Sequence, residues 1–201
     1  MISEETRSII EDLKKIEGEC RGVSIQSPLD YVALNHGEEK ALEVENQLEE
    51  LGIPTRKKVK ALEKYPIGYM TITHLVIKDI LSWSYDDIKK MGFTLPQLSF
   101  IVRTLSRYFL SAERTFQETP VYWKKHFTIG KLVPFKINTE KGYLIIRIEN
   151  YKTHPVDCFL FQGYFSRMIS YTIKTTNVSS EETECNHRGG DIHEFVIKWE
   201  V

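Results

Sequence analysis

The chain has 201 residues, with 41% hydrophobic and 27% charged side chains and a formal net charge of −1. This is the composition of a globular protein with a sizeable core, and the near-zero charge excludes recognition of nucleic acid or of an anionic membrane through bulk charge. No window holds the roughly 18 apolar residues that a membrane span needs, and the stretch MISEETRSIIEDLKK lacks the apolar region of a secretory signal. We therefore expect a cytoplasmic protein, in which the three cysteines are free thiols or metal ligands rather than a disulfide framework.

The N-terminal half of the sequence predicts mostly helices. Apolar residues at helical spacing, with Ser3 as N-cap, predict the first helix, and Ser27 followed by Pro28 predicts the start of another after a short strand. The basic stretch 54–67 contains turn residues and is expected to be a solvent-facing joint, not a nucleic-acid contact. The elements expected in this half are helices at 3–17, 27–36, 38–51, 71–83, 84–91 and 95–110 and a strand at 22–26.

At about Gly130 the hydrophobic pattern of the sequence changes from helical spacing to alternation. Runs that alternate apolar and polar residues predict strands, and a long apolar segment between them predicts a buried helix. The elements expected in this half are a short helix at 119–126 capped by Thr119, a helix at 155–173, and strands at 132–138, 142–150, 172–184 and 193–200. Helices followed by the order β-β-α-β-β predict an α+β fold, in which an antiparallel sheet packs against several helices.

Four residues near the C-terminus carry groups that ligate metals. They are Cys158 on the predicted helix, then Glu182, Cys185 and His193. Thiolate, carboxylate and imidazole together can complete a tetrahedral zinc shell. A turn with two adjacent glycines separates Cys185 from His193 and can fold one beside the other. Since there is no CxxC or HxxxH pair, a metal-free pair of buried cysteines is the alternative.

The segment DCFLFQGYFSRMISYTI, followed by EETECNHRGGDIHEFVIKWE, resembles the closing region of the vinyl-4-reductase domain. That region has a helix with a cysteine and a Gly-Tyr-x-Ser-like turn, a glutamate three residues before another cysteine, a Gly-Asp turn and a final F-x-I-x-W-like strand. The matching residues are Cys158, Gly163, Tyr164, Ser166, Glu182, Cys185, Gly190, Asp191, Phe195, Ile197 and Trp199. The wider fold group includes the haem nitric-oxide-binding domains and the trafficking subunits of the TRAPP tethering complex.

The resemblance implies a structural zinc beside a ligand pocket. In the phenol-sensing activators that this region resembles, three cysteines and a glutamate hold the zinc, which gives Cys158, Glu182 and Cys185 as ligands here. His193 stands where the family has its last cysteine, and imidazole is a competent zinc ligand. The rival donors are His187, Glu181 and Glu184.

A pocket of this kind needs apolar walls and a few polar anchors. Candidates come from the aromatic-rich stretches and from a histidine in an apolar helix, although each is as readily a core residue. The pocket residues expected are His74, Trp83, Tyr108, Phe161 and Tyr164. The resemblance thus predicts a small hydrophobic or aromatic ligand.

The leading hypothesis is a single domain over 1–201, with a helical lead-in at 1–60 and the resembling core at 70–201. We expect it to bind a small molecule as a sensor or carrier, and to act as a homodimer or through a separate signalling protein. The sequence has no phosphate loop, nucleophile elbow or metalloprotease motif, so we expect no enzymatic activity.

Two other functions remain open. One is a dimerising interaction scaffold of the vesicle-tethering kind, which a core without a cavity would favour, whereas a cavity of about 300 Å³ or more would favour the sensor. The other is a haem-based gas sensor. It is disfavoured because the segment 95–110 has no histidine and the haem-clamping pattern Tyr-x-Ser-x-Arg is absent.

Overall fold

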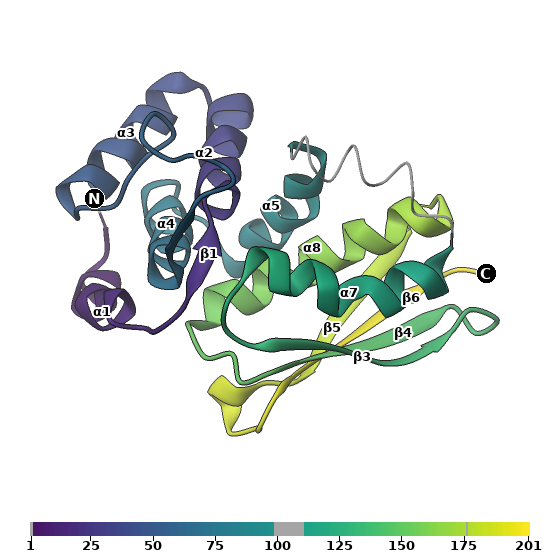
Figure 1. Cartoon of the computed structure of the whole chain (residues 1–201). Coiled ribbons are helices and arrows are strands. Elements are labelled where there is room, and N and C mark those ends of the chain that lie inside the picture. Colours follow the sequence, from purple (N-terminus) through teal and green to yellow (C-terminus); the bar gives the residue numbers. More distant parts are fainter. Residues whose placement is uncertain (1, 99–110, 176) are drawn as a thin grey trace.

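A computed structural model describes residues 2–98, 111–175 and 177–201. The N-terminal helices gather on one side of the molecule, and a sheet covered by helices forms the other side (Figure 1). In chain order the elements are α1 (Glu4–Lys14), β1 (Glu19–Arg21), α2 (Val23–His36), α3 (Glu38–Glu50), β2 (Lys64–Pro66), α4 (Ile67–Ile80), α5 (Tyr85–Leu98), α7 (Ala112–His126), β3 (Lys131–Asn138), β4 (Tyr143–Glu149), α8 (Pro155–Ile173), β5 (Val178–Glu184), η1 (Asn186–Arg188) and β6 (His193–Trp199).

Helix α1 begins as predicted from its capping residue. The Oγ atom of Ser3 accepts a hydrogen bond from the amide of Thr6 at 3.1 Å. The same hydroxyl donates to Asp79 Oδ2 at 2.8 Å, which ties α1 to the end of α4. Helix α3 also ends as predicted, since Gly52 follows it with φ of +75°, a conformation that glycine adopts without strain.

The strand expected at 22–26 and the helix start expected at Ser27 are wrong. The strand lies earlier, because β1 pairs antiparallel with β2, and α2 already begins at Val23. Ser27 is buried inside α2 rather than capping it, and Pro28 lies within the helix. The pairing of β1 with β2 depends on residues distant in the chain, and it outweighs the local Ser27-Pro28 pattern that predicted a helix start.

Two further helix boundaries also differ from the predictions. Helix α4 begins at Ile67, directly after β2, and not at residue 71. Helix α5 runs unbroken to Leu98 with Pro96 near its end, where the sequence suggested a break between two helices. The rest of the helix expected at 95–110 lies outside the described residues.

Helix α7 begins seven residues before the expected start at Thr119. Its N-cap is Ser111, whose Oγ accepts from the amide of Arg114 at 3.2 Å. Thr119 is therefore not a cap; its hydroxyl donates to the carbonyl of Phe116 at 2.8 Å. This longer α7 runs along the sheet beside its edge strand β3 (Figure 1).

The sheet has the strand order β3-β4-β6-β5, and every neighbouring pair is antiparallel. Helix α7 packs against β3, and α8 packs against β5 and β6. The α+β class and the antiparallel sheet expected from the sequence are confirmed. Helix α8 has the bounds predicted for it, with Pro155 in its first turn.

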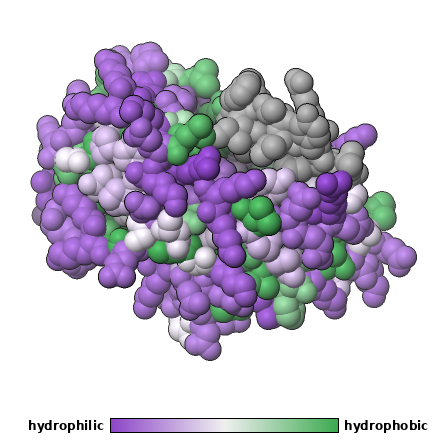
Figure 2. Space-filling model, viewed as in Figure 1, coloured by the Kyte–Doolittle hydropathy of each residue, from purple (hydrophilic) through white to green (hydrophobic). Residues whose placement is uncertain are grey.

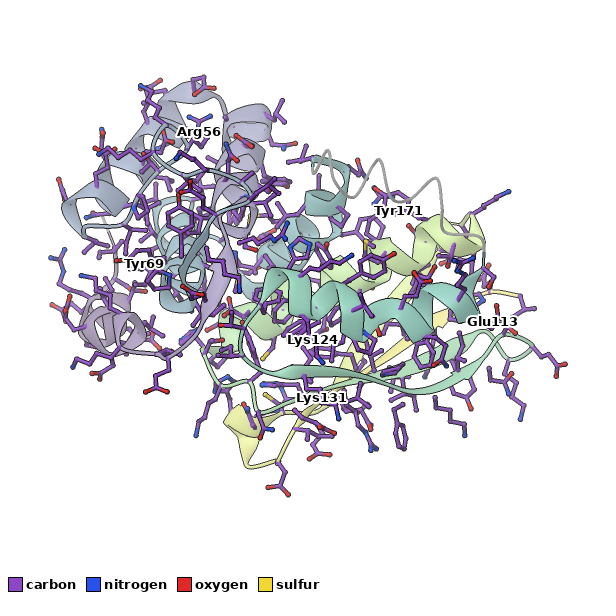
Figure 3. All side chains as sticks on the ribbon, viewed as in Figure 1. Arg56, Tyr69, Glu113, Lys124, Lys131 and Tyr171 are labelled. Carbon is purple, nitrogen blue, oxygen red and sulfur yellow. The ribbon has the colours of Figure 1, made fainter. Side chains whose placement is uncertain are left out.

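The basic stretch 54–67 is exposed at most of its cations, as expected, although Thr55, Val59 and Ile67 are buried. Its first cation, Arg56, is paired within the chain. Arg56 donates from Nε to Glu45 at 2.9 Å and from Nη2 to Glu38 at 2.8 Å (Figure 3). The face of the molecule in Figure 2 is mostly hydrophilic, with hydrophobic residues scattered over it. Within the described ranges, no helix is both long enough and apolar enough to cross a membrane.

Candidate functional site: an apolar cavity and a buried donor cluster

A partly enclosed cavity of about 160 Å³ lies between α7, α8 and the sheet. Helix α8 contributes Phe161 and Phe165, α7 contributes Trp123, and β4 contributes Leu144 and Ile146. The two β4 residues lie on one face of the sheet because side chains alternate along a strand. The two α8 residues are four apart and so lie on one face of the helix. The walls are therefore set by regular secondary structure.

Aromatic rings make one wall of the cavity. The ring of Phe161 lies 5.5 Å from Trp123 and 5.7 Å from Phe165, the second pair being stacked. Trp123 is anchored, because its Nε1 donates to the carbonyl of Ile129 at 2.9 Å. Such contacts hold the rings in fixed positions, which suits a binding site for a flat apolar molecule.

Few polar groups reach the cavity, and those that titrate are neutral at pH 7. Burial raises the pKa of Tyr164 to about 12, so its phenol keeps its proton. Burial, together with the positive charges of Arg21 and Lys125, lowers the pKa of His126 to about 4. The cavity therefore presents no fixed charge from either side chain.

The depressed pKa of His126 predicts a pH-dependent stability. Between its ordinary pKa of about 6.5 and the folded value of about 4, the unfolded chain binds a proton that the folded chain does not. Stability should therefore fall as the pH is lowered through this window, and part of that loss should vanish in His126→Gln. Urea unfolding at about pH 7 and about pH 5 measures the slope for both proteins. Equal slopes would show that His126 is not buried as described.

The expected pocket residues are only partly brought together. Phe161 and Tyr164 line the cavity. His74 and Trp83 do not: His74 bonds to Asp157, and Trp83 packs against Tyr31 with ring centroids 6.0 Å apart. Tyr108 lies outside the described residues. His74 and Trp83 therefore lie outside the wall of this cavity.

Helix α7 supplies Thr115, Phe116 and Trp123 to the cavity. Phe116 and Trp123 belong to the aromatic stretches that the sequence offers as candidates, but sequence reasoning missed Thr115 and did not place the three on one helix. These residues fall on one helical face only if α7 starts at Ser111. The signal that could have found this start is the cap itself, a serine followed by a run of helix-forming residues.

Asp157 is the centre of a buried hydrogen-bond network that joins α4 to α8. The carboxylate accepts from His74 Nδ1 at 2.8 Å, from Thr71 Oγ1 at 2.7 Å and from Thr153 Oγ1 at 2.6 Å. Burial acts to raise the pKa of Asp157, but the hydrogen bond from His74 and those from the two threonines outweigh it, so the pKa lies below its usual value. The carboxylate therefore stays ionised inside the core.

A second buried group lies at the same N-terminal end of α8, because Cys158 directly follows Asp157. Cys158, Glu182, Cys185 and His193 have donor atoms that all lie within 4.8 Å of one another. His193 Nδ1 is 2.8 Å from Glu182 Oε1 and 3.5 Å from Cys158 Sγ, and the two sulfur atoms are 4.0 Å apart. Helix η1 and Gly189, whose φ is +91°, turn the chain between Cys185 and His193. The structure thus brings together the four residues singled out in the sequence.

A backbone carbonyl orients the imidazole of the cluster. His193 Nε2 donates to the carbonyl of Tyr151 at 3.0 Å, which leaves Nδ1 facing Glu182 and Cys158. Burial, and next the carboxylate of Glu182, raise the pKa of Cys158 far above its usual value, so this thiol keeps its proton. The rivals His187, Glu181 and Glu184 are not part of the cluster. The role of the four residues as metal ligands stays a prediction.

No protein-family model and no curated protein matches the sequence. Solved structures do match the fold. An H-NOX protein from S. oneidensis in the Fe(II)NO state matches with TM-score 0.67 and 15% identity, covering 90% of this chain and 99% of that one. The H-NOX domain from Shewanella oneidensis in the Fe(II)CO state gives TM-score 0.65 and 14% identity, covering 90% and 98%. An unliganded Fe(II) H-NOX protein from K. algicida gives TM-score 0.59 and 15% identity, covering 90% and 97%.

These matches correct one expectation and support another. The structural zinc expected as the cofactor is wrong on this comparison, because the matched proteins are described by their iron and, in one case, by a haem in a distorted porphyrin. The finer resemblance to the vinyl-4-reductase domain is not confirmed. What the comparisons show is the fold: this chain has the architecture of the haem-NO-binding fold group.

Proposed function

We propose that this chain is a ligand-binding domain of the sensor type, and that it takes up one small apolar molecule in the cavity beneath α7 and α8. The observation that supports this most is the size and lining of the cavity. Its volume is about 160 Å³, and apolar side chains make most of its wall. An engineered protein cavity of about 150 Å³ holds one benzene molecule. A single aromatic ring is therefore the scale of ligand that we propose.

The cavity supports this proposal over the interaction scaffold, but it is smaller than the roughly 300 Å³ expected of a sensor from the sequence. It is still larger than the voids of an ordinary packed core. A scaffold gains nothing from unfilled apolar space, because each missing contact weakens the core. The expected homodimer, the separate signalling partner and the absence of enzymatic activity stay predictions.

The matched structures favour a haem-based gas sensor over the zinc-containing sensor expected from the sequence, and His126 offers an imidazole at the cavity. The described residues do not fit the macrocycle. A tetrapyrrole is several times larger than the single ring that this volume holds. The described lining also contains no lysine or arginine to pair with haem propionates. We expect purified protein incubated with haemin to show no Soret band; a stoichiometric band would favour the gas sensor.

Ligand binding would stabilise the folded domain by burying the ligand in the cavity. A ligand that fills the cavity restores contacts that the walls lack and stabilises the folded state according to its concentration relative to its Kd. It changes a signal only if a second conformation of the domain binds it less tightly. The cavity is lined by elements of different chain regions, among them α2, α7, β4 and α8, and so is placed to couple ligand occupancy to their packing.

Filling the cavity should abolish ligand binding. Ile146→Phe puts extra volume into the space from β4, where Ile146 is 3% exposed. We expect its affinity for ethylbenzene to fall at least about tenfold, a loss of about 1.4 kcal/mol of binding free energy. Isothermal titration calorimetry of the full chain measures this, and the melting temperature reports whether the variant folds.

The matched control is Ile145→Phe. Ile145 is the next residue on β4, is not part of the cavity wall and lies on the opposite face of the sheet. It should leave the affinity unchanged. If both variants bind ethylbenzene as well as the unaltered chain, the ligand does not occupy this cavity.

A further inference from the structure

Thr115 is a buried polar residue that lines the cavity from α7. It is 4% exposed. Among the described residues, no group makes a hydrogen bond with its Oγ1 atom. Threonine hydroxyls inside helices often bond to the carbonyl four residues earlier, but this hydroxyl does not.

Other hydroxyls of α7 at the cavity are satisfied by the protein itself. Thr119 donates to the carbonyl of Phe116 at 2.8 Å, and Tyr122 donates to Glu118 at 3.0 Å. Thr115 differs from them although it lies on the same helix. A buried hydroxyl without a partner is costly, since desolvation is not offset by a new hydrogen bond. Its position therefore needs an explanation that packing alone does not supply.

We propose that Thr115 is the specificity-determining polar anchor of the cavity, which selects small apolar ligands that carry one hydrogen-bonding oxygen or nitrogen. This inference rests on the proposed ligand-binding function of the cavity. A threonine hydroxyl can both donate and accept, so it can bond to an alcohol, an ether, a carbonyl or an amine. Since apolar side chains make most of the wall, the remainder of such a ligand should be apolar.

Two ligands of nearly equal shape can be used to measure what the hydroxyl of Thr115 contributes to binding. Benzyl alcohol and ethylbenzene differ by an OH in place of a CH₃, and Thr115→Val replaces the protein hydroxyl by a methyl group. We expect the ratio of the two Kd values to shift against benzyl alcohol by about threefold to tenfold in Thr115→Val, which is the range for one hydrogen bond. The Kd for ethylbenzene should stay the same or become slightly lower. Calorimetric titrations of the full chain measure both.

Two further variants keep the test decisive. Thr115→Ser retains the hydroxyl and should retain the ratio, even if Thr115→Val fails to fold. Tyr164→Phe removes a different hydroxyl from the same cavity and should leave the ratio unchanged. An unchanged ratio in Thr115→Val, a lost preference in Thr115→Ser, or a shift confined to Tyr164→Phe would overturn the assignment. If the unaltered chain binds neither ligand, the proposed function itself fails.

Discussion

Replacing Asp157 by alanine is expected to lower the free energy of unfolding by about 3–5 kcal/mol, because each buried donor left without its acceptor costs about 1–3 kcal/mol. Asp157 is fully buried and accepts hydrogen bonds from His74, Thr71 and Thr153. His74 and Thr71 would lose their acceptor in the core, where both are fully buried, and the partly buried Thr153 would lose its acceptor beside them. Urea unfolding followed by tryptophan fluorescence measures the loss.

An exposed aspartate provides the control. Asp12 pairs with Lys15 at 3.1 Å, but its side chain is 83% exposed, and such surface pairs contribute about 0–1 kcal/mol. Asp12→Ala should therefore change stability little. An Asp157→Ala variant that is no less stable than Asp12→Ala would mean that the network does not join α4 to α8 as described.

Replacing Gly163 by alanine is expected to destabilise the fold by about 3 kcal/mol, although alanine is the better helix former by about 1 kcal/mol. Helices α5 and α8 cross here with almost no space between their backbones. A Cβ atom on Gly163 would overlap the carbonyl of Lys89 and would lie 2.6 Å from the amide nitrogen of Phe93. Both neighbours are backbone atoms, so the helices themselves would have to move apart.

Gly52→Ala is the control, because it replaces a glycine by alanine at a position where the new Cβ has no steric clash. A Cβ on Gly52 would meet no atom within 4 Å, and the cost there is that of a left-handed conformation, about 1–2 kcal/mol. Thermal or urea unfolding compares the two variants. If Gly163→Ala costs no more than Gly52→Ala, the close crossing of α5 and α8 is not present.

The elements predicted best are those whose signal is local and periodic. Strand β4 alternates along its length, and α8 is a long apolar run that opens with a proline, so both were predicted to within a residue or so. The α+β class follows from their order. The grouping of Cys158 with His193 was also predictable, because a glycine turn follows Cys185 and because the residues resemble those of a known domain.

The features that the sequence did not predict depend on distant contacts. Strand β1 exists because it pairs with β2, more than forty residues later in the chain. His74 belongs to a network because Asp157, 83 residues away, lies beside it. The cavity is the space left between several elements, among them α7, α8 and β4, and no local pattern specifies how completely packed elements fill the space between them.

The measurement that tests the proposed function most directly is an isotope-edited nuclear Overhauser experiment on methyl-labelled protein with bound ethylbenzene. If the ligand occupies the cavity, its ring protons should show cross-peaks to the methyl groups of Leu144 and Ile146. Ile145, on the opposite face of the same strand, should show none. Cross-peaks to Ile145 alone, or none to any of these residues with saturating ethylbenzene, would contradict a ligand site in this cavity.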